Sequence, residues 1–365
     1  DVITDPLVGL YSDRFESRYG KRKPFMLFGC LLLIISFYAL IHPPKEYVAF
    51  WLLGFSMLVY LAWSIISIPY LAWSAEITSD YHEKTRLSGS REIFTILGAI
   101  SALLIPYFYG VSEDADESLS ILYTAFLLTL FLMLPVTMLG VKDSEVNEFK
   151  NVGLQELRTL WQRIPALRQL QGAFILNSLA NALPATLFLF FVEFVLQEES
   201  YTGPLLLLYF ASGIVGLPFW TILAIKNGKC KSWQASMLLA TIALVYVTYL
   251  GSADLLWFGL ISFISGLSLG ADMALPSSIQ ADMAQKIQNK KSSYAWILFG
   301  IWAMLTKFAL ALAVGIGFII LGLVGFEPST PTPVDLTTLS LLYGGAPVVF
   351  KMIAFWIMRD YRETD

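Results

Sequence analysis

The amino-acid sequence predicts an all-α membrane protein, and three of its properties support that prediction. Of its 365 residues, 56% are hydrophobic and only 14% are charged, whereas soluble domains carry about a quarter charged residues. The hydrophobic residues gather in runs of about 20 residues, which is the length that crosses a bilayer as a helix. Basic residues are concentrated in alternate connections between these runs, as expected of a polytopic membrane protein.

Eleven apolar runs separated by polar residues are predicted to be membrane spans. They cover 1–12, 25–42, 47–73, 91–110, 119–141, 170–196, 204–225, 233–250, 254–283, 293–324 and 336–357. The first run is too short to cross a bilayer alone, so we expect it to continue upstream and to be preceded by a first helix that is missing from this chain. Restoring that helix brings the expected total to twelve.

The Lys and Arg residues predict the orientation of these spans. Of 24 such residues, only Lys45 falls in the connections on one side, while the connections on the other side hold nearly all the rest. The positive-inside rule places the basic side, which includes the central loop and the C-terminus, in the cytoplasm. We therefore expect a multi-pass protein of the plasma membrane, specifically a bacterial inner membrane.

The longest connection divides the chain into two halves. It spans 142–169 and separates an N-terminal helix bundle at 1–141 from a C-terminal bundle at 170–365. With the upstream helix restored, each half has six helices. A weak internal repeat relates them, because Pro69 and Pro276 each precede acidic residues at the cytoplasmic end of the fourth helix of their half. Parallel repeats of this kind are typical of the major facilitator fold.

The first 24 residues join an apolar segment with two carboxylates to a tight basic loop. Asp1 and Asp5 are four residues apart and share one face of a helix, and acidic groups at membrane depth are costly unless they have a function. Two such carboxylates can hold Na⁺ or carry H⁺. The alternative is that Asp1 is only an acid at a helix start. The sequence has no phosphate-binding loop and no clustered metal ligands, so it predicts neither an enzyme nor a cofactor.

Two other charged residues lie far from the predicted helix ends. Lys307 is in the middle of a span and requires an internal partner, which Asp1, Asp5 or Asp272 could supply. A lysine that competes with a cation for a carboxylate would couple the two, whereas a static ion pair is the alternative. Asp272 either lines the path of the solute or balances the charge of Lys307 or Lys351. Lys351 itself is expected to extend toward the membrane interface.

Polar and aromatic side chains within the spans are candidates for binding a solute. Asn177 and Asn181 lie four residues apart on one span, and buried amides must find hydrogen-bond partners, which a hydroxyl-rich solute would provide. Tyr70 and Trp302 lie at depths where an aromatic ring could stack on a sugar. The alternative for the aromatic residues is a place at the lipid surface or the membrane interface.

Two further patches accompany the opening motif. One contains Ile68-Pro69-Tyr70 followed by Trp73, Glu76, Asp80 and Arg91, and the other contains Gln280-Ala281-Asp282 followed by Lys307. Together with the opening run from Asp1 to Pro24, they resemble the glycoside-pentoside-hexuronide:cation symporters of the major facilitator superfamily. This resemblance covers both halves of the chain.

The resemblance implies roles for five of these residues. Asp1 and Asp5 correspond to the paired aspartates that hold the coupling cation, with Ser64 as a hydroxyl beside them. Lys307 corresponds to the lysine near the cation and sugar sites. Ser67 stands where a sugar-binding acid is found in the family, which places a galactoside specificity in doubt.

The resemblance also implies a cytoplasmic gate that latches the two halves together, and an ordinary solvated loop is the alternative. Its members would be Asp13, Arg14, Arg18, Glu76, Asp80, Arg91 and Asp282.

The sequence thus predicts a symporter that moves a sugar or glycoside with Na⁺ or H⁺ by alternating access. A lysolipid or other amphiphilic solute is the alternative within transport, and a non-transporting membrane scaffold or sensor is the alternative outside it. The expected partners are the solute, the cation and the lipid bilayer, without nucleic acid, and a monomer is expected.

Overall fold

The computed structural model describes residues 8, 22–77, 81–111, 115–141, 159, 161–252, 254–287 and 295–361. Within these ranges it has ten helices that are long and apolar enough to cross a membrane. They correspond to the ten spans predicted from 25–42 onward, which confirms those spans. The predicted span at 1–12 lies outside the described residues apart from Val8.

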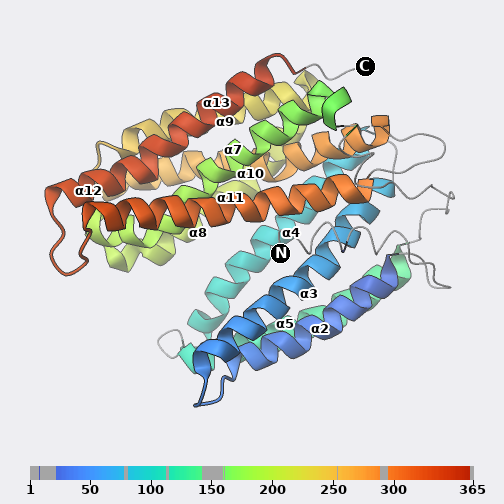
Figure 1. The fold of residues 1–365 in the computed structure, drawn as a ribbon, viewed down its shortest axis with the longest axis horizontal. Coiled ribbons are helices and arrows are strands. Elements are labelled where there is room, and N and C mark those ends of the chain that lie inside the picture. The colour runs from blue at the N-terminus through green and yellow to red at the C-terminus, as the bar shows by residue number, and fades with distance from the viewer. Residues whose placement is uncertain are drawn as a thin grey trace. The chain divides into compact units, whose positions relative to one another are not determined.

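Figure 1 shows the helices of the described residues in chain order. Their bounds are α2 (Lys23–Ile41), α3 (Val48–Glu76), α4 (Tyr81–Phe108), α5 (Ala115–Gly140), α7 (Pro165–Phe190), α8 (Thr202–Asn227), α9 (Lys229–Val247), α10 (Leu255–Ile287), α11 (Ala295–Val324), α12 (Pro333–Ser340) and α13 (Ala346–Arg359). Two π-helical segments, η1 (Phe191–Leu196) and η3 (Leu341–Gly345), extend α7 and join α12 to α13, and a short 3₁₀ turn, η2 (Glu199–Tyr201), precedes α8.

The chain divides into two compact units. The first comprises Asp1–Asp80, Gly98–Gly153 and Ala284–Met304, and the second comprises Tyr81–Leu97, Leu154–Met283 and Leu305–Asp365. Helices α4, α10 and α11 therefore each contribute one part to each unit. The domain boundaries at 141 and 170 stay a prediction.

In the first unit, α2 packs against α3 and α5 (Figure 1). Gly29 allows the approach of α2 to α3, because a Cβ atom there would lie 2.7 Å from Ile66 Cγ1. At the start of α2, Lys23 Nζ donates to the carbonyl oxygens of Met138 at 2.8 Å and Val141 at 2.9 Å. A cation at the carbonyl end of a helix is favourable, so Lys23 holds α2 against the end of α5.

In the second unit, the two π-helical segments meet in an aromatic core. The rings of Phe191 in η1 and Tyr343 in η3 stack with their centroids 4.4 Å apart, and Phe258 of α10 lies 5.2 Å from Phe191. A π-helical turn inserts an extra residue into a helix and redirects the side chains that follow it. The irregular turns thus occur where large rings of three helices pack together.

Glycine residues bring α8 and α10 into close contact. A Cβ atom at Gly270 would lie 2.6 Å from the backbone nitrogen of Leu217 and 2.7 Å from the carbonyl oxygen of Gly213. Trp220 on α8 donates through its indole nitrogen to the carbonyl oxygen of Leu267 at 2.8 Å. Small residues that let backbones approach are typical of helix packing in membranes.

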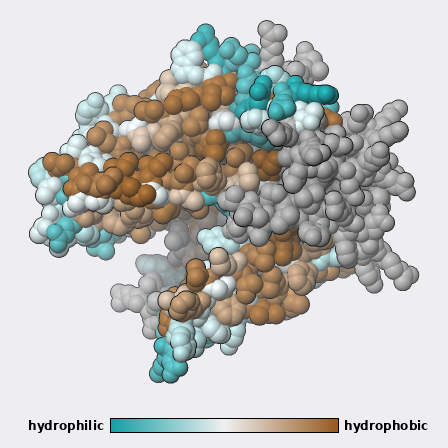
Figure 2. Space-filling model, viewed as in Figure 1, coloured by the Kyte–Doolittle hydropathy of each residue, from teal (hydrophilic) through white to brown (hydrophobic). Residues whose placement is uncertain are grey.

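Many large apolar side chains lie on the outer surface, as expected of helices that face lipid. Leu139, Leu256 and Leu323 are more than 80% exposed. Figure 2 shows hydrophobic residues along the middle of the helices on the visible face and hydrophilic residues near their ends. Such a large apolar surface would be unusual in a soluble monomer and supports a multi-pass membrane protein.

The α8–α10 contact can be tested with Gly270→Ala. Alanine favours a helix by up to about 1 kcal/mol over glycine, but the added methyl group would press on backbone atoms that cannot move aside, at a cost of about 1–3 kcal/mol. We expect a lower midpoint of thermal unfolding for the purified protein in detergent. Gly259→Ala on the same helix is the matched control, because its Cβ would make an ordinary contact of 3.9 Å with Leu208. Equal midpoints for both variants would contradict the close contact.

Candidate functional site

A cluster of five polar side chains lies within the second unit, on four different helices. Asn177 and Asn181 project from one face of α7, since residues four apart are neighbours on a helix surface. Trp233 comes from α9, Asp272 from α10 and Lys351 from α13. We refer to these five residues as the polar cluster.

The carboxylate of Asp272 is the centre of the polar cluster. Its Oδ2 atom accepts hydrogen bonds from Asn181 Nδ2 at 2.9 Å and from Lys351 Nζ at 3.0 Å. Its Oδ1 atom accepts from the indole nitrogen of Trp233 at 2.8 Å. Both oxygens are thus occupied by donors, one of them charged, as a buried carboxylate requires.

The ammonium group of Lys351 joins the carboxylate to a second amide. Besides its ion pair with Asp272, Lys351 Nζ donates to Asn177 Oδ1 at 2.9 Å. The side chains of Lys351 and Asp272 are only 2% and 5% exposed. A pair of opposite charges with several hydrogen bonds can remain ionised at such a depth, whereas either charge alone would be costly.

The structure corrects one expectation and confirms another. Lys351 does not extend to the membrane interface, because it is buried among α7, α10 and α13, and that expectation was wrong. It lies eight residues before Arg359, about 12 Å along a helix, and this depth could have predicted its burial. The charge-balancing role for Asp272 is confirmed with Lys351 as partner. No pattern in the sequence pointed to Trp233, whose role depends on the packing of α9.

The remaining candidate site residues are distributed over both units. In the first unit, Ser64 of α3 is fully buried and its hydroxyl donates to the carbonyl oxygen of Tyr60 at 2.9 Å. Ser67 and Tyr70, one and two turns further along α3, are half-buried, and Trp302 of α11 is buried.

Lys307 is half-buried and belongs to the second unit. Its association with the cation site stays a prediction.

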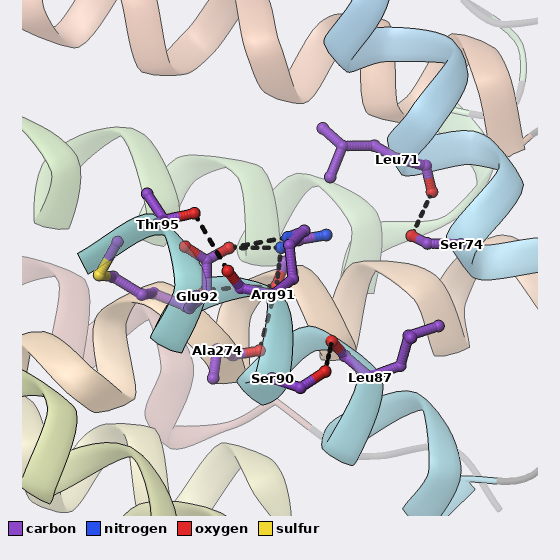
Figure 3. Close-up of polar contacts among 10 residues, drawn as sticks. Leu71, Ser74, Leu87, Ser90, Arg91, Glu92, Thr95 and Ala274 are labelled. Atoms are coloured by element: carbon purple, nitrogen blue, oxygen red, sulfur yellow. Dashed lines mark hydrogen bonds and ion pairs between the residues drawn. The ribbon is translucent and has the colours of Figure 1, made fainter. Parts of the chain in front are cut away.

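Two charged pairs lie toward the end of the second unit that is predicted to be cytoplasmic. Lys229 at the start of α9 forms an ion pair with Asp282 near the end of α10, with the lysine 1% and the aspartate 18% exposed. On α4, Arg91 donates to the neighbouring Glu92 through Nε at 3.0 Å and Nη2 at 2.6 Å (Figure 3). Arg91 Nη2 also reaches Ser277 Oγ of α10 at 3.5 Å.

Arg91 and Asp282 were predicted as gate residues, whereas their partners Lys229 and Glu92 were not singled out. The other gate candidates Asp13, Arg14, Arg18 and Asp80 lie outside the described residues, as do Asp1 and Asp5, and the side chain of Glu76 is not described. The cation site and the complete gate therefore stay predictions.

Comparison with known proteins gives consistent results. A family model described as MFS/sugar transport protein matches residues 1–365. The sodium-dependent lysophosphatidylcholine symporter 1-A of Danio rerio is 22% identical, over 99% of this chain and 76% of that protein. The glucuronide carrier protein homolog of Escherichia coli K12 is 23% identical, over 100% of this chain and 82% of that protein.

The fold also matches solved structures. The human organic anion transporter MFSD10 (TETRAN) superposes with a TM-score of 0.71 at 15% sequence identity, covering 98% of this chain and 80% of that chain. This likeness confirms the major facilitator fold that the sequence predicts.

A double-mutant cycle can test the ion pair of the polar cluster. Lys351→Met leaves the Asp272 carboxylate buried without its counter-charge, which we expect to lower the free energy of unfolding by about 3–5 kcal/mol. The double variant Asp272→Asn/Lys351→Met removes both charges, and it should be more stable than Lys351→Met alone. Thermal unfolding of the purified variants measures both effects. Additive losses in the cycle would show that the two charges do not interact.

The contribution of the ion pair between Lys229 and Asp282 to stability can be tested against a neighbouring lysine. Lys229→Met removes the partner of a largely buried carboxylate, and we expect a lower midpoint of thermal unfolding for this reason. Lys231→Met removes an exposed lysine two residues away and should leave the midpoint almost unchanged. A similar loss in both variants would mean that net charge, rather than this pair, determines the effect.

Proposed function

The chain belongs to the MFS/sugar transport protein family, among its glycoside-pentoside-hexuronide:cation symporter-like members, and we propose that its cargo is a sugar or glycoside. It is a multi-pass membrane protein and a cation-coupled secondary transporter rather than an enzyme. A solute and a coupling cation are therefore its partners. The identity of the solute is the main part of the proposal.

The polar cluster is the observation that carries the proposal. It places two amides and a neutralised carboxylate within apolar helices, next to one another. Asn181 is half-buried, so it keeps an accessible edge that can bind a hydroxyl group. Neutral polar groups in a low-dielectric surrounding suit an uncharged, hydroxyl-rich solute. Asn177, Asp272, Tyr70, Trp302 and Ser67 are further proposed contributors.

We place the coupling cation at Asp1 and Asp5, with Ser64 as an additional oxygen ligand. The burial of Ser64 supports this, because a hydroxyl far from water can complete the coordination of a small cation. Lys307 is proposed to compete with the cation for a carboxylate and so to couple the two fluxes. The cation is Na⁺ if both carboxylates stay ionised and H⁺ if one of them takes a proton.

The gate and the topology complete the proposal. We propose that Arg91 and Asp282, which pair with Glu92 and Lys229 within the second unit, belong to a latch that opens and closes during alternating access. We propose that the central loop and the C-terminus are cytoplasmic and that the protein resides in a bacterial inner membrane as a monomer. No nucleic acid is proposed as a partner.

A lysolipid is the second candidate solute. Two observations favour it: the Danio rerio relative that matches nearly the whole chain is named for lysophosphatidylcholine, and Ser67 replaces an acid that binds sugar in the resembling family. A serine at this position would leave room for an apolar chain or a headgroup instead of holding a sugar hydroxyl. The two solutes differ in their charged groups, since the lysolipid headgroup carries a phosphate and a choline ammonium and a neutral glycoside carries neither.

Uptake measurements test the coupling. We expect proteoliposomes with the intact protein to accumulate their solute under an imposed Na⁺ or H⁺ gradient, and Asp5→Asn to abolish accumulation because one ligand of the cation is lost. Asp360→Asn, an exposed aspartate after α13, is the control and should transport normally. Uptake indifferent to both gradients, or uphill transport by Asp5→Asn, would overturn the cation site.

A panel of labelled solutes tests the cargo. Methyl β-D-glucoside, a methyl pentoside, a methyl glucuronide and lysophosphatidylcholine should be offered to the same proteoliposomes. Accumulation of a neutral glycoside is the expected result. Accumulation of only the lysolipid would select the second candidate, and accumulation of none would overturn both proposed cargoes.

A further inference from the structure

We propose that the buried pair Asp272–Lys351 fixes the orientation of Asn181, so that this residue offers its Oδ1 acceptor to the solute. The group of the solute that binds there must then be a donor, such as a neutral hydroxyl. This inference rests on the proposed transport of a solute past Asn181 and adds the chemistry of that subsite.

The two ends of an asparagine amide have nearly the same shape, so its orientation is determined by its partners. An ionised carboxylate only accepts hydrogen bonds, and the contact between Asn181 and Asp272 Oδ2 must therefore use the NH₂ group. A lysine ammonium only donates, so its contact with Asn177 must use the amide oxygen. The charges on Asp272 and Lys351 thus assign both amides without ambiguity.

This assignment determines which end of the Asn181 amide is turned toward Asp272. With Nδ2 bound to Asp272, its other end is the Oδ1 atom, which has no hydrogen-bond partner among the described residues. Asn181 is half-buried, whereas Asn177 is only 2% exposed. Asn181 is therefore the more exposed of the two amides of the polar cluster, and Asn177 anchors Lys351.

Lys351 determines how firmly the amide of Asn181 is held in this orientation. If Asp272 were neutral, its side chain could donate as well as accept, and Asn181 could rotate by half a turn to present NH₂ instead. The ion pair with Lys351 keeps Asp272 in its accepting form, and the indole of Trp233 keeps the carboxylate in place from the opposite side. Both residues act through Asp272 and are positioning residues.

The acceptor has a consequence for solute selection. A carbonyl oxygen binds hydroxyl and amine donors but repels the oxygens of a phosphate or carboxylate, which carry no proton at neutral pH. A site that hydrogen-bonds a hydroxyl group rejects analogues without that donor strongly, because the buried acceptor is left unpaired. The Oδ1 atom of Asn181 therefore favours a sugar hydroxyl over an anionic headgroup.

The first part of the test concerns orientation and needs no solute. Asn181→Asp places a second carboxylate against Asp272, and at pH 8 we expect a clear loss in the midpoint of thermal unfolding. Asn181→Asp/Asp272→Asn has the same composition as the native protein but moves the carboxylate by one side chain, and it should regain most of the lost stability. If Asn181→Asp is as stable as the native protein, or the double variant is no better, the amide does not donate to Asp272 and the proposal fails.

The second part concerns the group presented to the solute. Methyl β-D-glucopyranoside and its 2-, 3-, 4- and 6-deoxyfluoro analogues serve as probes in proteoliposomes, because fluorine replaces a donor by a weak acceptor. At one ring position we expect the KM of the fluoro analogue to be about tenfold above that of the parent sugar, the loss expected for one hydrogen bond.

In Asp272→Asn this ratio should fall toward one, because Asn181 is then free to rotate. A purely structural role for Asp272 would raise both KM values and leave their ratio unchanged, which would overturn the proposal. If the native protein takes up none of the glucosides, the proposed sugar transport fails, while the stability measurements still decide whether Asp272 orients Asn181.

Discussion

The mutual neutralisation of Asp272 and Lys351 is the interaction on which the polar cluster depends. Each charge is almost completely removed from solvent, and an isolated ion at that depth would cost several kcal/mol. Neither residue can therefore be understood alone. Their pairing also connects α10 to α13, while the bonds to Asn181 and Trp233 extend the connection to α7 and α9. One ion pair thus determines how four helices present their polar groups.

The packing of α10 positions this ion pair. Gly270 and Asp272 are two residues apart, so their side chains point in directions about 200° apart around the helix. Gly270 lies against the backbone of α8, and Asp272 consequently faces the opposite side, where α7, α9 and α13 lie. A side chain at Gly270 would displace α10 away from α8 and change the distances around the carboxylate. The position of the carboxylate therefore depends on the close contact between α8 and α10.

Hydropathy and basic residues predicted the membrane spans well, because the need to cross an apolar layer leaves a signal in every segment of about 20 residues. The polar cluster was predicted only in part. Asn177, Asn181 and Asp272 were identified because polar groups are conspicuous in apolar runs, but which lysine neutralises Asp272 depends on how α13 packs on α7. Trp233 could not be identified, since a tryptophan near a helix end is usually an interfacial residue and only the fold reveals its indole nitrogen against a carboxylate.

The proposed division of labour between charged and neutral groups follows from electrostatics. A solute site with a net charge would attract or repel the coupling cation. The affinity for the solute and the affinity for the cation would then depend on the same group. The polar cluster avoids this, because its carboxylate and ammonium cancel and leave only oriented dipoles. Dipoles select by the direction of hydrogen bonds, whereas the carboxylates proposed for the cation select by charge. Under this arrangement the cation supplies the driving force at one site. The orientation of Asn181 determines which solute binds at another site and is transported.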